Sequence, residues 1–183
     1  MNRSKPAVRA RRTVARSRLF QVEEMDLEFS NGIRTCYERL VGGNGAVLIA
    51  PMLDADTVLL IREYAAGTDR YELGLPKGKI EAGEDILSAA DREIMEEVGY
   101  GSRRLTGLGA LSLAPGYLAH TSHLVLAEDL YPHRVPGDEP EEIEVLPWSI
   151  RDLGRLLERE DFSEARSIAG LFMVREHLLG GKE

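Results

Sequence analysis

Three glutamates close together, Glu93, Glu96 and Glu97, are the residues of this sequence best suited to chemistry. At about 100° per residue, a helix places Glu96 about 60° to one side of Glu93 and Glu97 about 40° to the other. The three carboxylates then share one face, where like charges destabilise the helix by some tenths of a kcal/mol per pair. A divalent cation would offset that repulsion. Hard carboxylate oxygens favour Mg²⁺, with Mn²⁺ as the alternative.

A solvated acidic helix face is the competing interpretation, and it would be favoured if the glutamates stood alone. They are part of a longer pattern of fixed spacing, which makes a metal site the better interpretation. The glycine at its start lets the backbone approach a ligand closely, and its neighbour Lys77 can offer a carbonyl to a metal and an ammonium to a phosphate. The pattern comprises Gly78, Glu84, Arg92, Glu93, Glu96, Glu97 and Gly99.

The element that must position the glutamates is a helix expected over residues 85–98. Gly99 and Gly101 follow it, and glycine accepts the left-handed conformation that ends helices. Its apolar positions fall on one side of the wheel and are expected to pack on a sheet while the acidic face stays open. These positions are Leu87, Ala90, Ile94 and Val98.

The remaining pattern is mostly strands before this helix and strands then helices after it. Asn31-Gly32 predicts a hairpin turn, because both residues tolerate positive φ. Residues 71–84 are expected to be largely loop. We therefore predict an α+β fold with an N-terminal antiparallel β extension: a flexible basic tail over residues 1–12, the extension over 13–45 and the main domain over 46–183. Further strands are expected over 46–51, 57–64, 105–113, 122–130 and 143–148, and helices over 150–160 and 163–179.

Composition excludes several classes of protein. With 183 residues, 43% of them hydrophobic, the chain suits one globular domain. It has no run of about 18 apolar residues for a membrane span and no apolar leader. The first 18 residues carry seven basic and no acidic groups, whereas the rest carries 16 basic and 31 acidic groups, a net charge of −15. That acidic body disfavours nucleic acid and suits metal ions.

The chain has one cysteine, Cys36, so an internal disulfide is impossible. This fits a cytoplasmic location. We expect Cys36 to be a buried small hydrophobe in a strand rather than a nucleophile, since a thiol without an activating partner is inert.

The pattern from Gly78 to Gly99 resembles the signature of the Nudix hydrolases. The one departure is Tyr100, where the signature has an aliphatic residue. The resemblance implies the Nudix fold, an α/β/α sandwich around a mixed sheet. It also implies hydrolysis of a nucleoside diphosphate linked to a further moiety.

Beyond the signature, the chain resembles the ADP-ribose pyrophosphatase branch, and within it the NudE-type hydrolases of ADP compounds. The similarity runs from about Thr13 to His177 and includes the segments 13–20, 26–32, 61–64 and 137–141. Pro115 matches a proline that the branch carries after the signature. In this branch the first β elements exchange between protomers, so the resemblance implies a homodimer.

The resemblance also assigns roles to individual residues. It implies that Glu93 and Glu97 are the principal metal ligands, that Glu96 is a further or bridging ligand with a part in catalysis, and that the Lys77 carbonyl is a backbone ligand. In the branch, a loop before the last strand supplies the base and one more ligand, which here are Glu139 and Glu141. From the residues alone, that stretch is only a solvated polar loop.

The implied substrate contacts come from several segments. Phe20, Arg34 and Arg39 match positions that hold adenine or phosphates, although a strand surface explains them equally well. Ala65 replaces a common arginine of the branch, for which Arg62 is the expected substitute, and His120 replaces a common glutamate. Both departures weaken strict ADP-ribose specificity. The complete set is Phe20, Arg34, Arg39, Arg62, Lys79, Pro115 and Gly116.

The expected activity is Mg²⁺-dependent hydrolysis that releases AMP from ADP-ribose, diadenosine triphosphate or NADH. Water is activated by the metal and deprotonated by Glu139. The expected partner is a small nucleotide, with neither nucleic acid nor membrane. A MutT-like hydrolase of nucleoside triphosphates is the alternative enzyme, a non-catalytic ADP-ribose sensor is the alternative binding protein, and a nucleic-acid-binding protein would depend on the basic N-terminal arm.

Overall fold

The computed structural model describes residues 4–138 and 140–180. The chain divides into two units, each with its own internal contacts. One comprises Met1–Gly43 and Ser112–His120, and the other comprises Asn44–Leu111 and Thr121–Glu183. The expected boundary near residue 45 is close to the observed one, but the expectation missed the later segment that joins the first unit.

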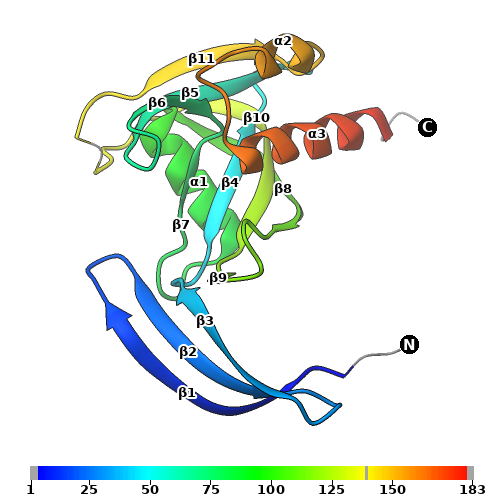
Figure 1. Ribbon diagram of the computed structural model, residues 1–183. Coiled ribbons are helices and arrows are strands. Elements are labelled where there is room, and N and C mark those ends of the chain that lie inside the picture. The colour runs from blue at the N-terminus through cyan, green and yellow to red at the C-terminus, as the bar shows by residue number, and fades with distance from the viewer. Residues whose placement is uncertain (1–3, 139, 181–183) are drawn as a thin grey trace. The chain divides into compact units, whose positions relative to one another are not determined.

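The first unit is a four-stranded sheet in the order β1-β2-β3-β9 (Figure 1). β1, β2 and β3 are antiparallel neighbours, as expected, whereas β9 pairs with β3 in parallel. The turn between β2 and β3 holds Gly32 at a φ of 79°, which confirms the hairpin predicted from Asn31-Gly32. The strands are β1 (Ala7–Arg16), β2 (Gln21–Glu28), β3 (Arg34–Val41) and β9 (Leu118–Ala119).

The tail predicted over residues 1–12 is wrong from Ala7 onward, because β1 begins there. Basic residues of this strand find acidic partners on β2. Arg9 donates to Glu28 at 3.0 Å, and Arg12 donates to Asp26 at 2.9 Å. The sequence alone indicates a mobile arm because these partners lie 19 and 14 residues away.

The first unit has no buried core among its described residues. Cys36, expected to be buried, is exposed on β3. The prediction failed because alternating strand residues are buried only where something covers the sheet. Apolar side chains therefore remain exposed on this unit, namely Val8, Val14, Leu19, Phe20, Ile33, Tyr37, Leu113 and Tyr117.

The second unit contains two sheets. One has the order β7-β4-β10-β8 and is mixed, because β4 and β10 are parallel and the other pairs are antiparallel. The other has the order β11-β5-β6 and is antiparallel. The strands are β4 (Ala46–Pro51), β5 (Thr57–Ala65), β6 (Arg70–Gly74), β7 (Lys77–Lys79), β8 (Tyr100–Leu111), β10 (Ser122–Pro132) and β11 (Glu144–Ser149).

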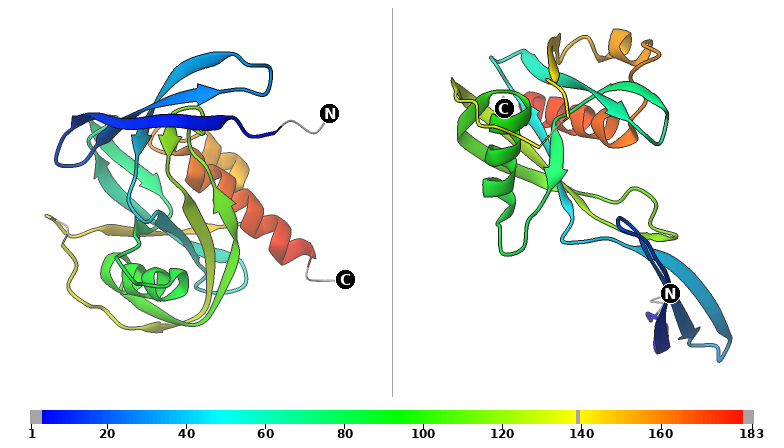
Figure 2. Two further views of the ribbon diagram at one scale, coloured as in Figure 1. Left: turned by 90° about the horizontal axis from the view of Figure 1, so that it is seen from below. Right: turned by 90° about the vertical axis from the view of Figure 1, so that its left-hand side faces the viewer.

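Helices pack on both faces of the sheet that contains β4 (Figures 1 and 2). Alternate residues of β4 enter two separate cores, Val47 with α1 on one face and Leu48 with α3 on the other. This arrangement confirms the predicted α/β/α sandwich with a mixed sheet. The helices are α1 (Ile86–Glu97), α2 (Leu153–Leu157) and α3 (Ala165–Gly180). None of the helices in the described residues is long and apolar enough to cross a membrane.

Three expected elements differ from the structure. β8 begins at Tyr100, before the start of the strand expected over 105–113. α2 spans only Leu153–Leu157 within the helix expected over 150–160. The expected loop over 71–84 contains most of β6 and all of β7. β7 exists because it pairs with β4, in a register that sets Gly78 opposite Val47. That long-range pairing leaves no periodic signal in so short a segment.

Candidate active site

Helix α1 begins and ends where its sequence signals lie. The side chain of Asp85 accepts hydrogen bonds from the backbone N–H groups of Leu87 and Ser88 at 3.0 and 3.1 Å, which caps the N-terminus. Gly99 follows the C-terminus at a φ of 82°. These two ends orient the turns that carry the three glutamates.

Two of the three clustered carboxylates of α1 are buried, contrary to the expected open face, whereas Glu96 is half-buried. Glu93 is 7% exposed and Glu97 is 4% exposed. The covering residues belong to β7 and its approach, where the backbone N–H of Lys77 donates to Glu97 Oε2 at 3.0 Å. Burial raises the pKa of Glu97 to about 8, and the nearby Lys77 ammonium and N–H only partly oppose that rise.

Arg92 connects the acidic residues of the site. Its Nε and Nη2 donate to the two oxygens of Glu84 at 2.9 and 3.1 Å. Its Nη1 donates to Glu93 at 2.8 Å and to Glu96 at 3.1 Å. The hydrogen bond from Arg92 is the main reason that the pKa of Glu84 is lowered. One guanidinium thus orients three carboxylates, and Nη2 also donates to the Lys79 carbonyl at 3.1 Å.

Position 78 requires glycine because the backbone of β7 lies against the Glu93 carboxylate, and not because the chain turns there. A Cβ at this position would overlap the carboxylate of Glu93. The absence of a side chain lets β7 pass directly over the helix carboxylates, which is the close approach expected of this glycine.

The donor set fits a hard divalent cation. Glu93, Glu96 and Glu97 bring three carboxylates to one helix face, and the guanidinium of Arg92 pairs with only two of them, Glu93 and Glu96. Carboxylate oxygens are ligands that Mg²⁺ and Mn²⁺ prefer. A cation there would also favour the ionised form of Glu97, which burial disfavours.

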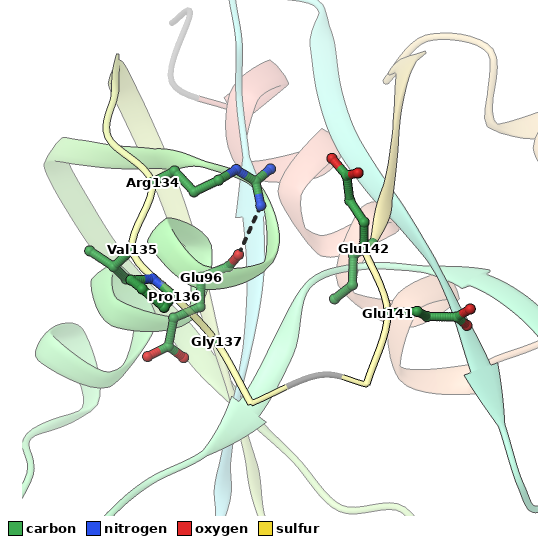
Figure 3. Close-up of a pocket in the computed structure, with 8 residues that line it drawn as sticks. Glu96, Arg134, Val135, Pro136, Gly137, Glu141 and Glu142 are labelled. Carbon is green, nitrogen blue, oxygen red and sulfur yellow. Dashed lines mark hydrogen bonds between the residues drawn. The ribbon is translucent and has the colours of Figure 1, made fainter.

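A cavity of about 650 Å³ opens beside α1 (Figure 3). Glu96 lies on one wall, and Arg134 donates to its backbone carbonyl at 3.3 Å. Glu141 and Glu142 lie on the opposite side of this cavity. The structure thus brings Glu141 to the same cavity as Glu96 but does not turn it toward the helix glutamates, since its carboxylate accepts from the Tyr71 hydroxyl at 2.7 Å. The proposed base, Glu139, lies outside the described residues.

Arg62, which is expected to contact the substrate, forms two ion pairs in this structure. It donates to Glu144 at 2.6 Å and to Asp161 at 2.9 Å. Arg62 is therefore neutralised by two carboxylates. Lys77 supplies a different cation: its Nζ donates to Glu63 Oε2 at 3.0 Å, next to the site. Sequence reasoning missed Glu63, whose only signal is a charge at the end of an apolar strand run.

The other expected substrate contacts belong to the first unit. Arg34 donates to Glu28 at 2.7 Å, and Arg39 pairs with Glu23 at 2.7 Å. Phe20 is exposed, so it is available to stack on a base. Pro115 and Gly116 lie in the later segment of this unit, between β8 and β9.

Comparison with known families gives two matches. A model of the NudE-type Nudix hydrolase N-terminal domain matches residues 6–39, which includes part of the sheet of the first unit. A model of the NUDIX domain matches residues 44–170, which includes the helix glutamates and Arg92.

Individual relatives extend these matches over the whole chain. The chain is 51% identical over 177 residues to the ADP compounds hydrolase NudE of Escherichia coli (strain K12), covering 96% of this chain and 95% of that protein. It is 28% identical to an ADP-ribose pyrophosphatase of Bacillus subtilis (strain 168), covering 85% and 88%. A crystal structure of an ADP compounds hydrolase matches with a TM-score of 0.91 and 50% identity, covering 100% of this chain and 98% of that one.

Proposed function

Since this chain belongs to the Nudix hydrolase family, we propose that it hydrolyses the pyrophosphate bond of ADP compounds and releases AMP. The observation that carries the proposal is the joint placement of Glu93 and Glu96 on Arg92 and of Glu97 on the backbone N–H of Lys77 in β7. The names of the relatives, ADP compounds hydrolase and ADP-ribose pyrophosphatase, support the class of substrate. We expect ADP-ribose, diadenosine triphosphate and NADH to be substrates.

Glu93, Glu96 and Glu97, with the carbonyl of Lys77, would hold the metal, which we propose to be Mg²⁺ with Mn²⁺ as the alternative. When bound, the metal neutralises the pyrophosphate and lowers the pKa of water. Arg92 keeps Glu93 and Glu96 oriented through its Nη1. The Lys77 ammonium stands beside the site as a further cation for a phosphate oxygen.

The proton of the attacking water requires a base. We propose Glu139, with Glu141 as a further metal ligand, by analogy with the branch that the sequence resembles. Glu141 could reach the metal if it exchanged its hydrogen bond from Tyr71 for the metal. Both residues are in the loop that leads into β11, and Glu141 lines the cavity beside Glu96.

Three alternatives receive less support. A non-catalytic ADP-ribose sensor would not need all three helix glutamates to be kept and oriented. A MutT-like hydrolase of nucleoside triphosphates would not need the sheet of the first unit. Nucleic acid is also disfavoured as a partner, because several of the cations on the first unit are paired with carboxylates, namely Arg9, Arg12, Arg34 and Arg39.

We also propose a homodimer and a cytoplasmic location. The uncovered apolar side chains of the first unit support dimerisation, because exposed apolar patches on soluble proteins commonly mark interfaces. The single cysteine is consistent with a reducing compartment. The mass of the protein in solution, measured by light scattering, tests the dimer directly.

The test of the activity is AMP release with Mg²⁺ from ADP-ribose, diadenosine triphosphate, NADH and dGTP, for wild type and Glu97→Gln. We expect wild type to cleave the adenine compounds and the variant to lose most of that rate, since one carboxylate is removed with its shape kept. Cleavage of dGTP alone would support the MutT-like alternative. Binding of ADP-ribose without any cleavage would support the sensor.

A further inference from the structure

A second cavity, of about 400 Å³, lies in the second unit between the β5–β6 hairpin and the start of α3. Its volume falls in the usual range for small-molecule sites, about 300–1,000 Å³. It is distinct from the cavity beside Glu96, and the two have no lining residue in common. It is lined by Glu63, Tyr64, Ala65, Gly67, Thr68, Glu72, Leu73, Gly74, Lys77, Ser163, Glu164 and Ser167.

Lys77 connects this cavity to the glutamates of α1. Its backbone N–H donates to Glu97 Oε2 at 3.0 Å, while its ammonium donates to Glu63 Oε2 at 3.0 Å on the cavity wall. A ligand whose phosphate lies near Glu97 could therefore extend past Lys77 into this cavity. The position fits the group attached to the second phosphate of an ADP compound.

The charge of the wall limits what the cavity can take. Glu63, Glu72 and Glu164 contribute three carboxylates, against one ammonium from Lys77. Glu72 is held by Arg70 at 2.8 Å, and Glu164 is held by Arg166 at 2.7 Å, so both are fixed structural anions. A further phosphate would be repelled here. An uncharged group would not be.

The wall also offers a specific acceptor. Glu63 Oε2 is held by Lys77, and among the described residues no hydrogen bond is donated to Oε1. A carboxylate oxygen accepts hydrogen bonds from hydroxyl groups. Ala65, Gly67 and Gly74 keep the cavity wide by having little or no side chain.

We propose that this cavity binds an uncharged, hydroxyl-bearing group, such as a sugar, that is esterified to the second phosphate. Glu63 accepts hydrogen bonds from its hydroxyls, and Lys77 contacts the phosphate that links it to AMP. The inference rests on the proposed pyrophosphate hydrolysis and adds the site that selects the second half of the substrate. It favours ADP-ribose over diadenosine triphosphate, whose second half begins with a further phosphate.

The first test narrows the cavity with Gly67→Leu. A Cβ at Gly67 meets no atom within 4 Å, so the variant is expected to fold. The substrates are ADP-ribose and the β-methyl ester of ADP, which has the same pyrophosphate but no sugar on the second phosphate. We expect kcat/KM for ADP-ribose to fall roughly tenfold or more, and that for the methyl ester to stay within about twofold. Gly154→Leu, on α2 and also in open space, is the matched control.

The outcomes separate the two proposals. If wild type cleaves neither compound, the proposed function fails and this inference with it. If wild type cleaves both and Gly67→Leu changes both equally or neither, the hydrolase stands and the sugar site is wrong. A greater loss for diadenosine triphosphate than for ADP-ribose would also contradict the sugar assignment.

The second test removes the acceptor with Glu63→Met, using Glu158→Met on the exposed end of α2 as control. We expect a selective loss for ADP-ribose relative to the methyl ester. An equal loss on both compounds would mean that Glu63 acts only by holding Lys77, and would overturn its role in hydroxyl recognition.

Discussion

The α-carbon of Gly78 lies so close to the carboxylate of Glu93 that a side chain at position 78 would overlap it. This approach joins β7 to the face of α1 that carries the glutamates. It explains why a short strand and a helix can together enclose carboxylates that a helix alone would expose. Several consequences can be measured.

Replacing Gly78 by alanine should displace Glu93 or β7. We expect Gly78→Ala to lower the free energy of unfolding by about 1–3 kcal/mol, as insertion of a methyl group into a packed site does, and to remove most metal-dependent activity. Denaturant unfolding and AMP release measure the two effects. Gly107→Ala, on β8 with no atom within 4 Å of the new Cβ, is the control and should change stability by less than about 0.5 kcal/mol. Equal behaviour of the two variants would contradict the close approach.

Arg92 should not tolerate lysine. Its Nε and Nη2 hold both oxygens of Glu84, a bidentate arrangement that an ammonium cannot reproduce. We expect Arg92→Lys to destabilise the protein by about 2 kcal/mol and to reduce activity. Arg155→Lys, on the exposed surface of α2, is the matched control. If Arg92→Lys keeps the stability of wild type, the guanidinium does not hold these carboxylates together.

Metal should stabilise the folded protein through the helix glutamates. A ligand that binds only the folded state at about 100 times its Kd adds roughly 2.7 kcal/mol. We expect Mg²⁺ to raise the Tm of wild type, and a chelator to reverse the rise and abolish activity. Glu93→Gln should show little rise. A similar rise in both proteins would mean that the metal binds elsewhere.

Signals within a few residues predicted a substantial part of this protein. The Asn31-Gly32 turn and the helix between Asp85 and Gly99 each depend on neighbouring residues alone, and both were predicted. The spacing of Glu93, Glu96 and Glu97 also predicted that their carboxylates lie together, because residues three and four apart share one face of a helix.

The features that the sequence did not predict depend on residues far apart in the chain. The burial of Glu97 requires β7 to pair with β4, and Arg62 is neutralised by Asp161, which is 99 positions away. β9 joins the first unit by pairing with β3, although about half of the second unit's sequence lies between the two strands. A single sequence carries no local record of such contacts.

Two deletions of different length test whether the N-terminal basic residues belong to the fold. Removal of residues 1–5 leaves β1 intact, so we expect unchanged Tm and activity. Removal of residues 1–12 deletes more than half of β1 and its ion pairs with β2, so we expect a lower Tm and a loss of the dimer. Thermal unfolding and light scattering measure both. If deletion of residues 1–12 changes neither the Tm nor the dimer, these residues behave as a flexible tail, and the assignment of β1 to the folded structure is wrong.

Asp161 should contribute stability that depends on pH. The hydrogen bond from Arg159 is the main cause that lowers the pKa of this carboxyl below its usual value, and Arg62 adds to it. A carboxyl with a lowered folded pKa stabilises the protein above its unfolded pKa, and that contribution is lost as the pH falls through the folded pKa. We expect Asp161→Asn to cost about 1 kcal/mol at pH 7. Denaturant unfolding between pH 2 and 7 should show the difference from wild type shrinking below about pH 4, whereas a difference that is constant with pH would mean that the ionised carboxylate contributes nothing.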